Sequence, residues 1–146
     1  MTNLPIIGWR EWLILPDLNI SGIKAKIDTG ARTSTLHAFR VEPYQKCHQL
    51  WIKFAIHQDQ YNTQNWLECH AEVKDQRMVS DSGGHKQLRY IIETRMCIGY
   101  HAFMAEMTLT CRDDMRFRML LGRTALNGRF IVDSRASYLH GKHLGV

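Results

Sequence analysis

The 146-residue sequence lacks the segments that mark membrane and secreted proteins. No stretch approaches the roughly 18 uninterrupted apolar residues that a membrane-spanning helix requires, so we expect no membrane partner. Near the amino end, Pro5 and then Arg10 and Glu11 interrupt the chain before an apolar secretory core could develop. We therefore expect a cytoplasmic protein.

Cysteine is also scarce, with four residues spread along the chain at Cys47, Cys69, Cys97 and Cys111. This number and spacing do not resemble the framework of a disulfide-stapled secreted domain, so we expect free thiols. None of the four lies in a recognisable signature of a nucleophilic-cysteine enzyme. This favours a role for them as small buried apolar residues.

Motifs for binding metals and nucleotides are missing as well. The sequence contains neither His-Glu-x-x-His nor Cys-x-x-Cys. The remaining candidate pairs of ligands are Cys47-His48, Cys69-His70, and Cys97 with His101. Adjacent residues of a strand face opposite sides, so these pairs do not readily converge on one ion. Since there is also no glycine-rich phosphate loop with Lys and Ser/Thr, we expect no cofactor and no bound metal.

The composition predicts one globular domain over residues 1–146. Hydrophobic residues make up 45% of the chain and charged residues 23%, which is typical of such domains. A chain of this length buries roughly 68% of the surface that it exposes when unfolded. The net charge of +5 agrees with an ordinary solvated surface and also suits an acidic peptide partner. We expect no nucleic-acid partner.

Hydrophobic patterning favours β-strands. Turn signals recur about every eight to twelve residues, the spacing of a small β-sandwich or barrel. From Leu50 to Ile56 the even positions are large and apolar, which predicts a strand with one buried face. The same alternation predicts strands over 67–73 and 103–109. Shorter strands are expected over 12–15, 18–20 and 23–27, with turns at Pro16-Asp17 and Ser21-Gly22.

Two short helices and one projecting hairpin complete these expectations. We predict the helices just after Ala31 and over Thr124–Asn127, the second ended by Gly128 at a C-cap position. Segments 77–80 and 87–93 flank a polar, glycine-containing stretch at 81–86. That stretch suits the tip of a hairpin.

The most informative motif is Asp28-Thr29-Gly30-Ala31, which follows the strand predicted over 23–27. On its own the triplet is also good turn chemistry, because Asp and Thr side chains hold the local backbone and Gly accepts positive φ. A second feature strengthens it. Met119-Leu120-Leu121-Gly122-Arg123 is an apolar strand that ends in Gly-Arg just before the second predicted helix.

Together these motifs resemble the retropepsin-like aspartic peptidases, which combine a strand ending in Asp-Thr/Ser-Gly-Ala with a later apolar pair followed by Gly and often Arg. The stretches Gly22–Ser34 and Leu120–Arg123 are closer still to a bacterial family known as ATP-dependent zinc proteases. That family is regarded as retropepsin-like, and some members are associated with ATP-grasp glutamate ligases. The resemblance runs from Gly8 to Tyr138. It implies an all-β fold, a closed retropepsin-like barrel of six or more strands with one or two short helices.

The resemblance also implies an aspartic endopeptidase whose catalytic residues are Asp28, Thr29 and Gly30. Two carboxylates held about 3 Å apart share one proton, so one can activate water while the other donates to the carbonyl oxygen, as in aspartic proteases. The second carboxylate would come from Asp28 of another copy in a homodimer. The implied contacts to a peptide substrate are Ala31, Arg32, Ser82, Gly83, Gly84 and Arg123, and the hairpin at 81–86 would act as a flap.

Two details qualify the resemblance. Asp81-Ser82-Gly83 is the other permitted spelling of the triplet, but it lies in a polar tip and the chain is too short for two complete lobes, so we interpret it as a hairpin tip. Arg32 stands where better-known retropepsins carry an acidic residue. We interpret Arg32 as a contact for an acidic substrate.

Two alternatives to an aspartic peptidase stay open. The first is a non-catalytic accessory protein that binds acidic or glutamylated peptides and assists an ATP-grasp glutamate ligase, as Arg32, Arg123 and the net charge would allow. The second is a zinc-dependent protease, as the family name suggests. Any dependence on ATP would then come from a partner protein.

Overall fold

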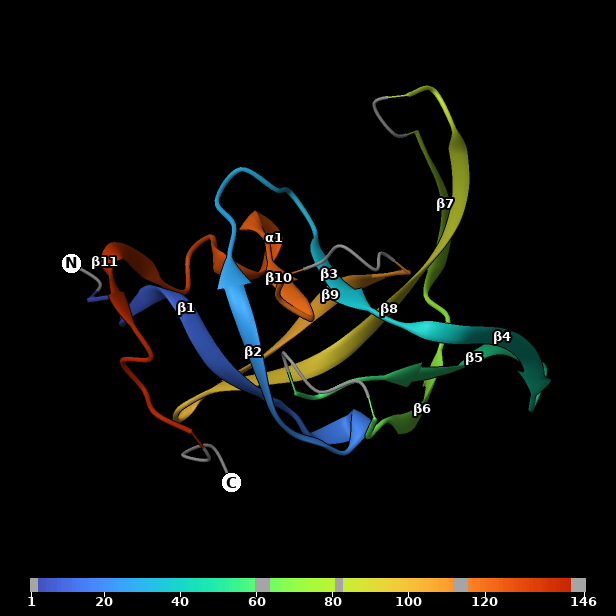
Figure 1. Ribbon diagram of the computed structural model, residues 1–146, viewed down its shortest axis with the longest axis horizontal. Helices are drawn as coiled ribbons and strands as arrows, with labels where there is room; N and C mark the ends of the chain where they lie inside the picture. Colours follow the sequence, from blue (N-terminus) through green and yellow to red (C-terminus); the bar gives the residue numbers. More distant parts are fainter. Residues whose placement is uncertain (1–2, 60–63, 81–82, 112–115, 143–146) are drawn as a thin grey trace.

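Nearly every regular element of the computed structural model, which describes residues 3–59, 64–80, 83–111 and 116–142, is a β-strand (Figure 1). The strands are β1 (Ile6–Leu15), β2 (Ile20–Ile27), β3 (Ser34–His37), β4 (Phe39–Lys46), β5 (Gln49–Ile56), β6 (Leu67–Glu72), β7 (Asp75–Ser80), β8 (Lys86–Ile98), β9 (His101–Thr110), β10 (Met119–Leu121) and β11 (Ile131–Ser137). The described helices are a 3₁₀ turn at Pro16–Leu18 and α1 (Arg123–Leu126). The predicted all-β class and the second predicted helix are confirmed.

The strands form one large sheet and one small sheet. The large sheet has the order β11-β1-β2-β10-β3-β9-β8-β7, and the small one has the order β4-β5-β6. Strand β8 also pairs with β1 at a single residue pair, Ile14 with Cys97. Two strands near opposite ends of the sheet order are therefore in contact. The finer expectation of a closed barrel stays a prediction.

Strand β10 occupies an unusual place in the large sheet. It comes late in the chain but lies between two early strands, parallel to β2 and antiparallel to β3. Three residue pairs join it to β2, among them Leu121 with Ile27. The end of β2 and the start of α1 are therefore neighbours, although they are far apart in sequence (Figure 1).

Both sheets contribute to one hydrophobic core. In β5 the alternation predicted from the sequence is confirmed, because Ile52, Phe54 and Ile56 are at most 1% exposed. They belong to the same buried cluster as Ile23 and Ile92 of the large sheet. Burying a side chain of this size contributes roughly 1.5–3 kcal/mol, so the shared core holds the small sheet against the large one.

The structure corrects the predicted details around β2. A turn was expected at Ser21-Gly22, with a strand over 18–20 before it, but β2 runs without interruption from Ile20 to Ile27. Leu18 instead belongs to the 3₁₀ turn, which Asn19 ends in the left-handed region at φ 58°. Pairing with β1 and burial of alternate β2 side chains outweigh the turn preference of Ser and Gly.

The predicted hairpin is present and is longer than expected. Strands β7 and β8 pair from Asp75 with Ile91 to Ser80 with Lys86, and the hairpin projects from the body of the molecule (Figure 1). Gly84 adopts φ 83°, which suits a tight turn. Asp81 and Ser82 lie outside the described residues. Across the described part of the chain, no helix has the length and apolar character that crossing a membrane would take.

The four cysteines are free thiols, as predicted. Cys69 and Cys97 are buried as expected, whereas Cys47 and Cys111 are exposed, so the expectation of buried residues is wrong for these two. Burial raises the pKa of the Cys69 thiol from its ordinary 9.0 to about 12, and the neighbouring carboxylate of Glu68 acts in the same direction. Cys69 therefore stays protonated at neutral pH.

We predict that an alkylating reagent at about pH 8 labels Cys47 and Cys111 in the folded protein and leaves Cys69 and Cys97 unmodified, because the thiolate is the reactive form and must be accessible. All four should be labelled after denaturation. Mass spectrometry of tryptic peptides measures both. Labelling of Cys69 at the same rate as Cys47 in the folded state would contradict the burial described here.

Candidate active site

The loop that follows β2 holds Asp28 by backbone hydrogen bonds, one of which reaches its carboxylate. Asp28 is half-buried at the end of the strand, and its N–H donates to the carbonyl of Leu121 in β10 at 2.8 Å. The N–H of Gly30 donates to Asp28 Oδ1 at 3.0 Å, and the N–H of Ala31 donates to the Asp28 carbonyl at 3.2 Å. The backbone of Asp28 is thus held on both sides, and one oxygen of its carboxylate accepts a hydrogen bond within the loop.

The start of α1 forms hydrogen bonds with the same loop. The N–H groups of Arg123 and Thr124 donate to the carbonyls of Ala31 and Arg32, both at 2.9 Å. The guanidinium of Arg123 donates to the carbonyl of Thr29 at 3.0 Å. These bonds explain why the helix expected just after Ala31 is absent, since α1 uses the carbonyls that such a helix would need.

Gly122 sits where β10 passes under the loop, and no larger residue fits there. A Cβ at this position would lie 2.7 Å from the carbonyl carbon of Thr33 and 3.0 Å from the carbonyl oxygen of Ala31. The buried N–H of Gly122 donates to Ser34 Oγ at 3.0 Å. Close backbone contact here is what brings β10 against the Asp28 loop.

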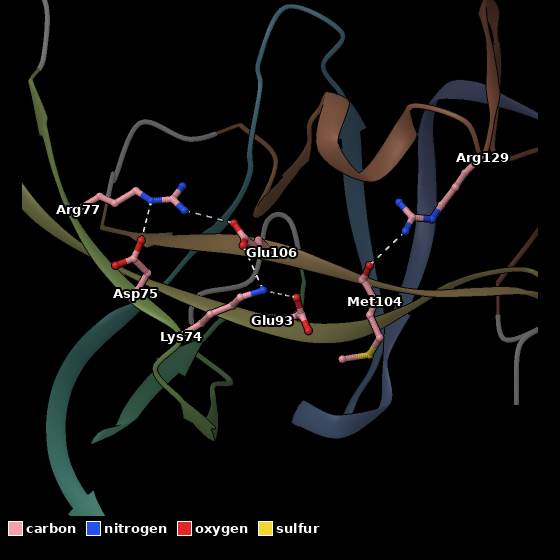
Figure 2. Close-up of polar contacts among 7 residues, drawn as sticks. All are labelled: Lys74, Asp75, Arg77, Glu93, Met104, Glu106 and Arg129. Atoms are coloured by element: carbon pink, nitrogen blue, oxygen red, sulfur yellow. Dashed lines mark hydrogen bonds and ion pairs between the residues drawn. The ribbon is translucent and has the colours of Figure 1, made fainter. Parts of the chain in front are cut away.

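A network of ion pairs lies at the base of the β7–β8 hairpin and connects it to β9 (Figure 2). Glu93 of β8 and Glu106 of β9 are directly opposite each other, an arrangement that would repel, and Lys74 pairs with both. The two glutamates raise the pKa of Lys74, chiefly through hydrogen bonds. Arg77 bridges Asp75 at 3.0 Å and Glu106 at 3.5 Å.

The network orients the hairpin without adding much stability. The backbone N–H of Gln76 and then the guanidinium of Arg77 lower the pKa of Asp75, so it stays ionised at neutral pH. All these side chains are accessible to solvent, where a single ion pair contributes about 0–1 kcal/mol. Several pairs on adjoining strands nevertheless link the base of the hairpin to β9.

The predicted site residues fall into two groups. Asp28, Thr29, Gly30, Ala31, Arg32 and Arg123 come together in the loop and its support. Gly83 and Gly84 lie at the exposed end of the hairpin, which rises on the same side of the view as the loop in Figure 1. Ser82 is outside the described residues. Arg123, predicted as a substrate contact, also supports the loop through Thr29.

Sequence reasoning missed two parts of this arrangement. Ser34 is fully buried and accepts the Gly122 N–H, yet it gave no signal in a polar stretch of the sequence. The glutamates that meet at the base of the hairpin come from separate strands, so only the strand register reveals them.

The described residues contain no cluster of metal ligands. Within them, no three or more side chains of His, Cys, Asp or Glu gather closely enough to hold an ion. The candidate pair Cys69-His70 points in two directions, since Cys69 Sγ lies against the Leu18 carbonyl while His70 contacts Tyr44 and Glu68.

Comparison with known proteins gives a family and several relatives. The model of a RimB-like family, described as "Retropepsin-like aspartic endopeptidase RimB", matches residues 6–143. A protein of Shewanella halifaxensis named "Probable alpha-L-glutamate ligase" is 39% identical over 96% of this chain. One of the same name from Parasynechococcus marenigrum is 40% identical over 97%. The matched regions cover 31% and 30% of those relatives, so the chain spans about a third of their length.

A solved structure supports the fold. The crystal structure of a Legionella pneumophila protein of unknown function superposes with a TM-score of 0.78. The match covers 94% of this chain and 99% of the other, at 22% sequence identity. At that identity the likeness concerns the fold alone.

We predict that Gly122→Ala lowers the free energy of unfolding by at least about 2 kcal/mol, because the new Cβ must push apart two backbone segments. Gly128→Ala is the control. Its Cβ would meet nothing within 4 Å, and only its φ of 76° opposes the change, at about 1 kcal/mol. Urea denaturation measures both. Equal losses would show that the close approach beneath the Asp28 loop is not what Gly122 provides.

Proposed function

The chain belongs to the RimB-like family of retropepsin-like aspartic endopeptidases, and from this premise we propose that it hydrolyses peptide bonds with a pair of Asp28 carboxylates, one from each subunit of a homodimer. The observation that carries the proposal is the loop itself. Asp28 is held by Gly30 and by the β10–α1 segment, at the end of a buried strand. Such preorganisation is what an acid–base group requires.

In the proposed reaction the two carboxylates share one proton. The ionised one takes a proton from water, which attacks the carbonyl carbon of the substrate, while the protonated one donates to the carbonyl oxygen. Collapse of the tetrahedral intermediate breaks the C–N bond as the leaving amine takes up a proton. Thr29 would hydrogen-bond across the pair, and Gly30 leaves room for the two loops to approach.

A homodimer is proposed because the sequence has one Asp-Thr-Gly triplet that follows an apolar strand. In a two-fold symmetric dimer, the same patch of both subunits meets at the axis, so identical residues face each other. Asp28 Oδ1 already accepts a hydrogen bond from Gly30 within its own subunit. Each subunit would therefore bring its carboxylate to the axis in a fixed orientation.

The proposed substrate is an acidic or glutamylated peptide. Arg32 and Arg123 are exposed beside Asp28, and their charges would attract carboxylates. Gly83 and Gly84, at the tip of the β7–β8 hairpin, would close over the bound chain and exclude water, with Ala31 lining the groove. The relatives' name, alpha-L-glutamate ligase, agrees with glutamate-rich peptides as the chemistry to be recognised.

A second candidate is an accessory protein that binds such peptides for a glutamate ligase without cleaving them. It is favoured by one specific observation, that regions similar to this chain form about a third of longer proteins named as ligases. A separate ATP-grasp ligase would then be the partner of this chain. The groove would be the same, and only the chemistry would differ.

We predict that Asp28→Asn abolishes peptidase activity on glutamate-rich peptides without unfolding the protein. The amide keeps the size of the side chain but cannot alternate as base and acid. Asp81→Asn is the matched control, because it removes the acid of the other Asp-Ser/Thr-Gly triplet and should leave activity largely unchanged. Cleavage is measured by mass spectrometry between about pH 4 and 8, where a shared proton should titrate, with and without a strong chelator.

Three results would decide among the candidates. Loss of activity in Asp28→Asn alone, unaffected by chelator, supports the aspartic mechanism. Activity that survives Asp28→Asn and disappears with chelator would establish a metalloprotease instead. Binding of acidic peptides with no cleavage at any pH in this range would favour the accessory protein.

A further inference from the structure

Four cations gather on one face of the sheet formed by β11, β1 and β2. They are Arg10 of β1, Lys24 and Lys26 of β2, and Lys142 beyond β11, and we refer to them as the cationic surface. Arg10 pairs directly with Lys26, and Lys24 with Trp12, in the register of β1 and β2. Directly opposite like charges destabilise a sheet, so this arrangement costs the fold something on its own.

Aromatic rings hold three of these cations in place. Lys142 Nζ lies 4.3 Å and Lys24 Nζ 5.3 Å from the centre of the Trp12 ring. The Arg10 guanidinium lies 5.0 Å from the centre of the Tyr138 ring, and its Nε donates to Ser137 Oγ at 3.1 Å. Such contacts fix the side chains without neutralising their charge.

Within the described part of the chain, these cations have no acidic partners. Among the described residues, none forms an ion pair with Arg10, Lys24, Lys26 or Lys142. Glu11 is close in sequence but fully buried, and it accepts N–H groups of Gly8, Leu139 and His140. The positive potential of the four cations is therefore directed at solvent.

We propose that the cationic surface binds an extended, carboxylate-rich peptide segment. Lys24 and Lys26 are two residues apart on one strand, so their side chains leave the backbone roughly 7 Å apart. Alternate side chains of an extended peptide have the same spacing. Arg10 of β1 lies opposite Lys26, so the row of cations, the track for the peptide, extends over two strands. Carboxylates on every second residue of such a peptide could each meet a cation.

An acidic peptide fits this surface better than single-stranded nucleic acid. Proteins that bind single strands without sequence preference stack bases on open aromatic faces. Here Lys24 and Lys142 lie over the ring of Trp12, and Arg10 and Lys24 lie over that of Tyr138. The groups offered to a ligand are thus ammonium and guanidinium ions.

The surface leads to the candidate active site. Lys26 is two residues before Asp28, and Ile27 between them is buried, so the track ends roughly 7 Å from the loop. In the proposed peptidase it would hold the part of an acidic substrate that flanks the bond to be cleaved, and this role rests on the proposed function. Binding itself requires no cleavage.

The test measures binding of a fluorescent octaglutamate peptide to the full chain carrying Asp28→Asn, by anisotropy at low ionic strength. Adding Lys24→Gln and Lys26→Gln should weaken binding at least about fivefold. The matched control adds Lys46→Gln and Arg95→Gln, which remove the same charge elsewhere. Lys46 is itself 4.5 Å from the Trp51 ring centre, like Lys24 over Trp12. This control should change affinity less than about twofold.

Any one of three other outcomes would overturn the inference. Equal weakening by both pairs of substitutions would mean that only net charge matters. Tighter binding of an oligouridylate than of octaglutamate would identify a nucleic-acid surface. Absence of octaglutamate binding to the parent protein at about 0.01 M ionic strength would reject it outright. Because Asp28 is already replaced, none of these results depends on whether the protein is a peptidase.

Discussion

The rest of the structure depends on the insertion of β10 between β2 and β3. Gly122 makes this possible, because without a side chain it lets the two segments approach more closely than any larger residue would allow, and its N–H finds a partner in Ser34 Oγ. The inserted strand then supplies a partner for the Asp28 N–H, and α1 supplies partners for the loop carbonyls. A carboxylate at the end of a buried strand is thereby held rigidly in a segment that otherwise has no regular structure.

This constraint also agrees with the proposal that one subunit supplies half of a site. The hydrogen bonds that hold Asp28 are made within its own subunit, so in the proposed homodimer a partner would need only to bring a second copy of the loop. The β7–β8 hairpin is built differently, since its direction depends on accessible ion pairs around Glu106. A firmly held Asp28 loop and a more weakly held hairpin would suit the proposed catalytic role of the loop and the proposed flap.

Much of the site could be predicted from the sequence, because its main motifs are local. Asp28-Thr29-Gly30 and the apolar pair before Gly122 are short motifs that are informative in combination, and alternation in β5 identifies a buried face. The predictions of a turn at Ser21-Gly22 and of a helix after Ala31 were wrong, because hydrogen bonds to distant parts of the chain determine the backbone conformation at both places. Ser34 and the cationic surface depend on strand register, which no local pattern contains.

The central claim is that Asp28 acts in pairs, and mixed dimers test it most directly. Active protein is unfolded and refolded with increasing amounts of the Asp28→Asn variant, so that the subunits combine at random, and peptidase activity is measured at constant total protein. If each site needs Asp28 from both subunits, activity falls with the square of the active fraction, to about a quarter in an equal mixture. Activity that falls in simple proportion, to about a half, would contradict the account.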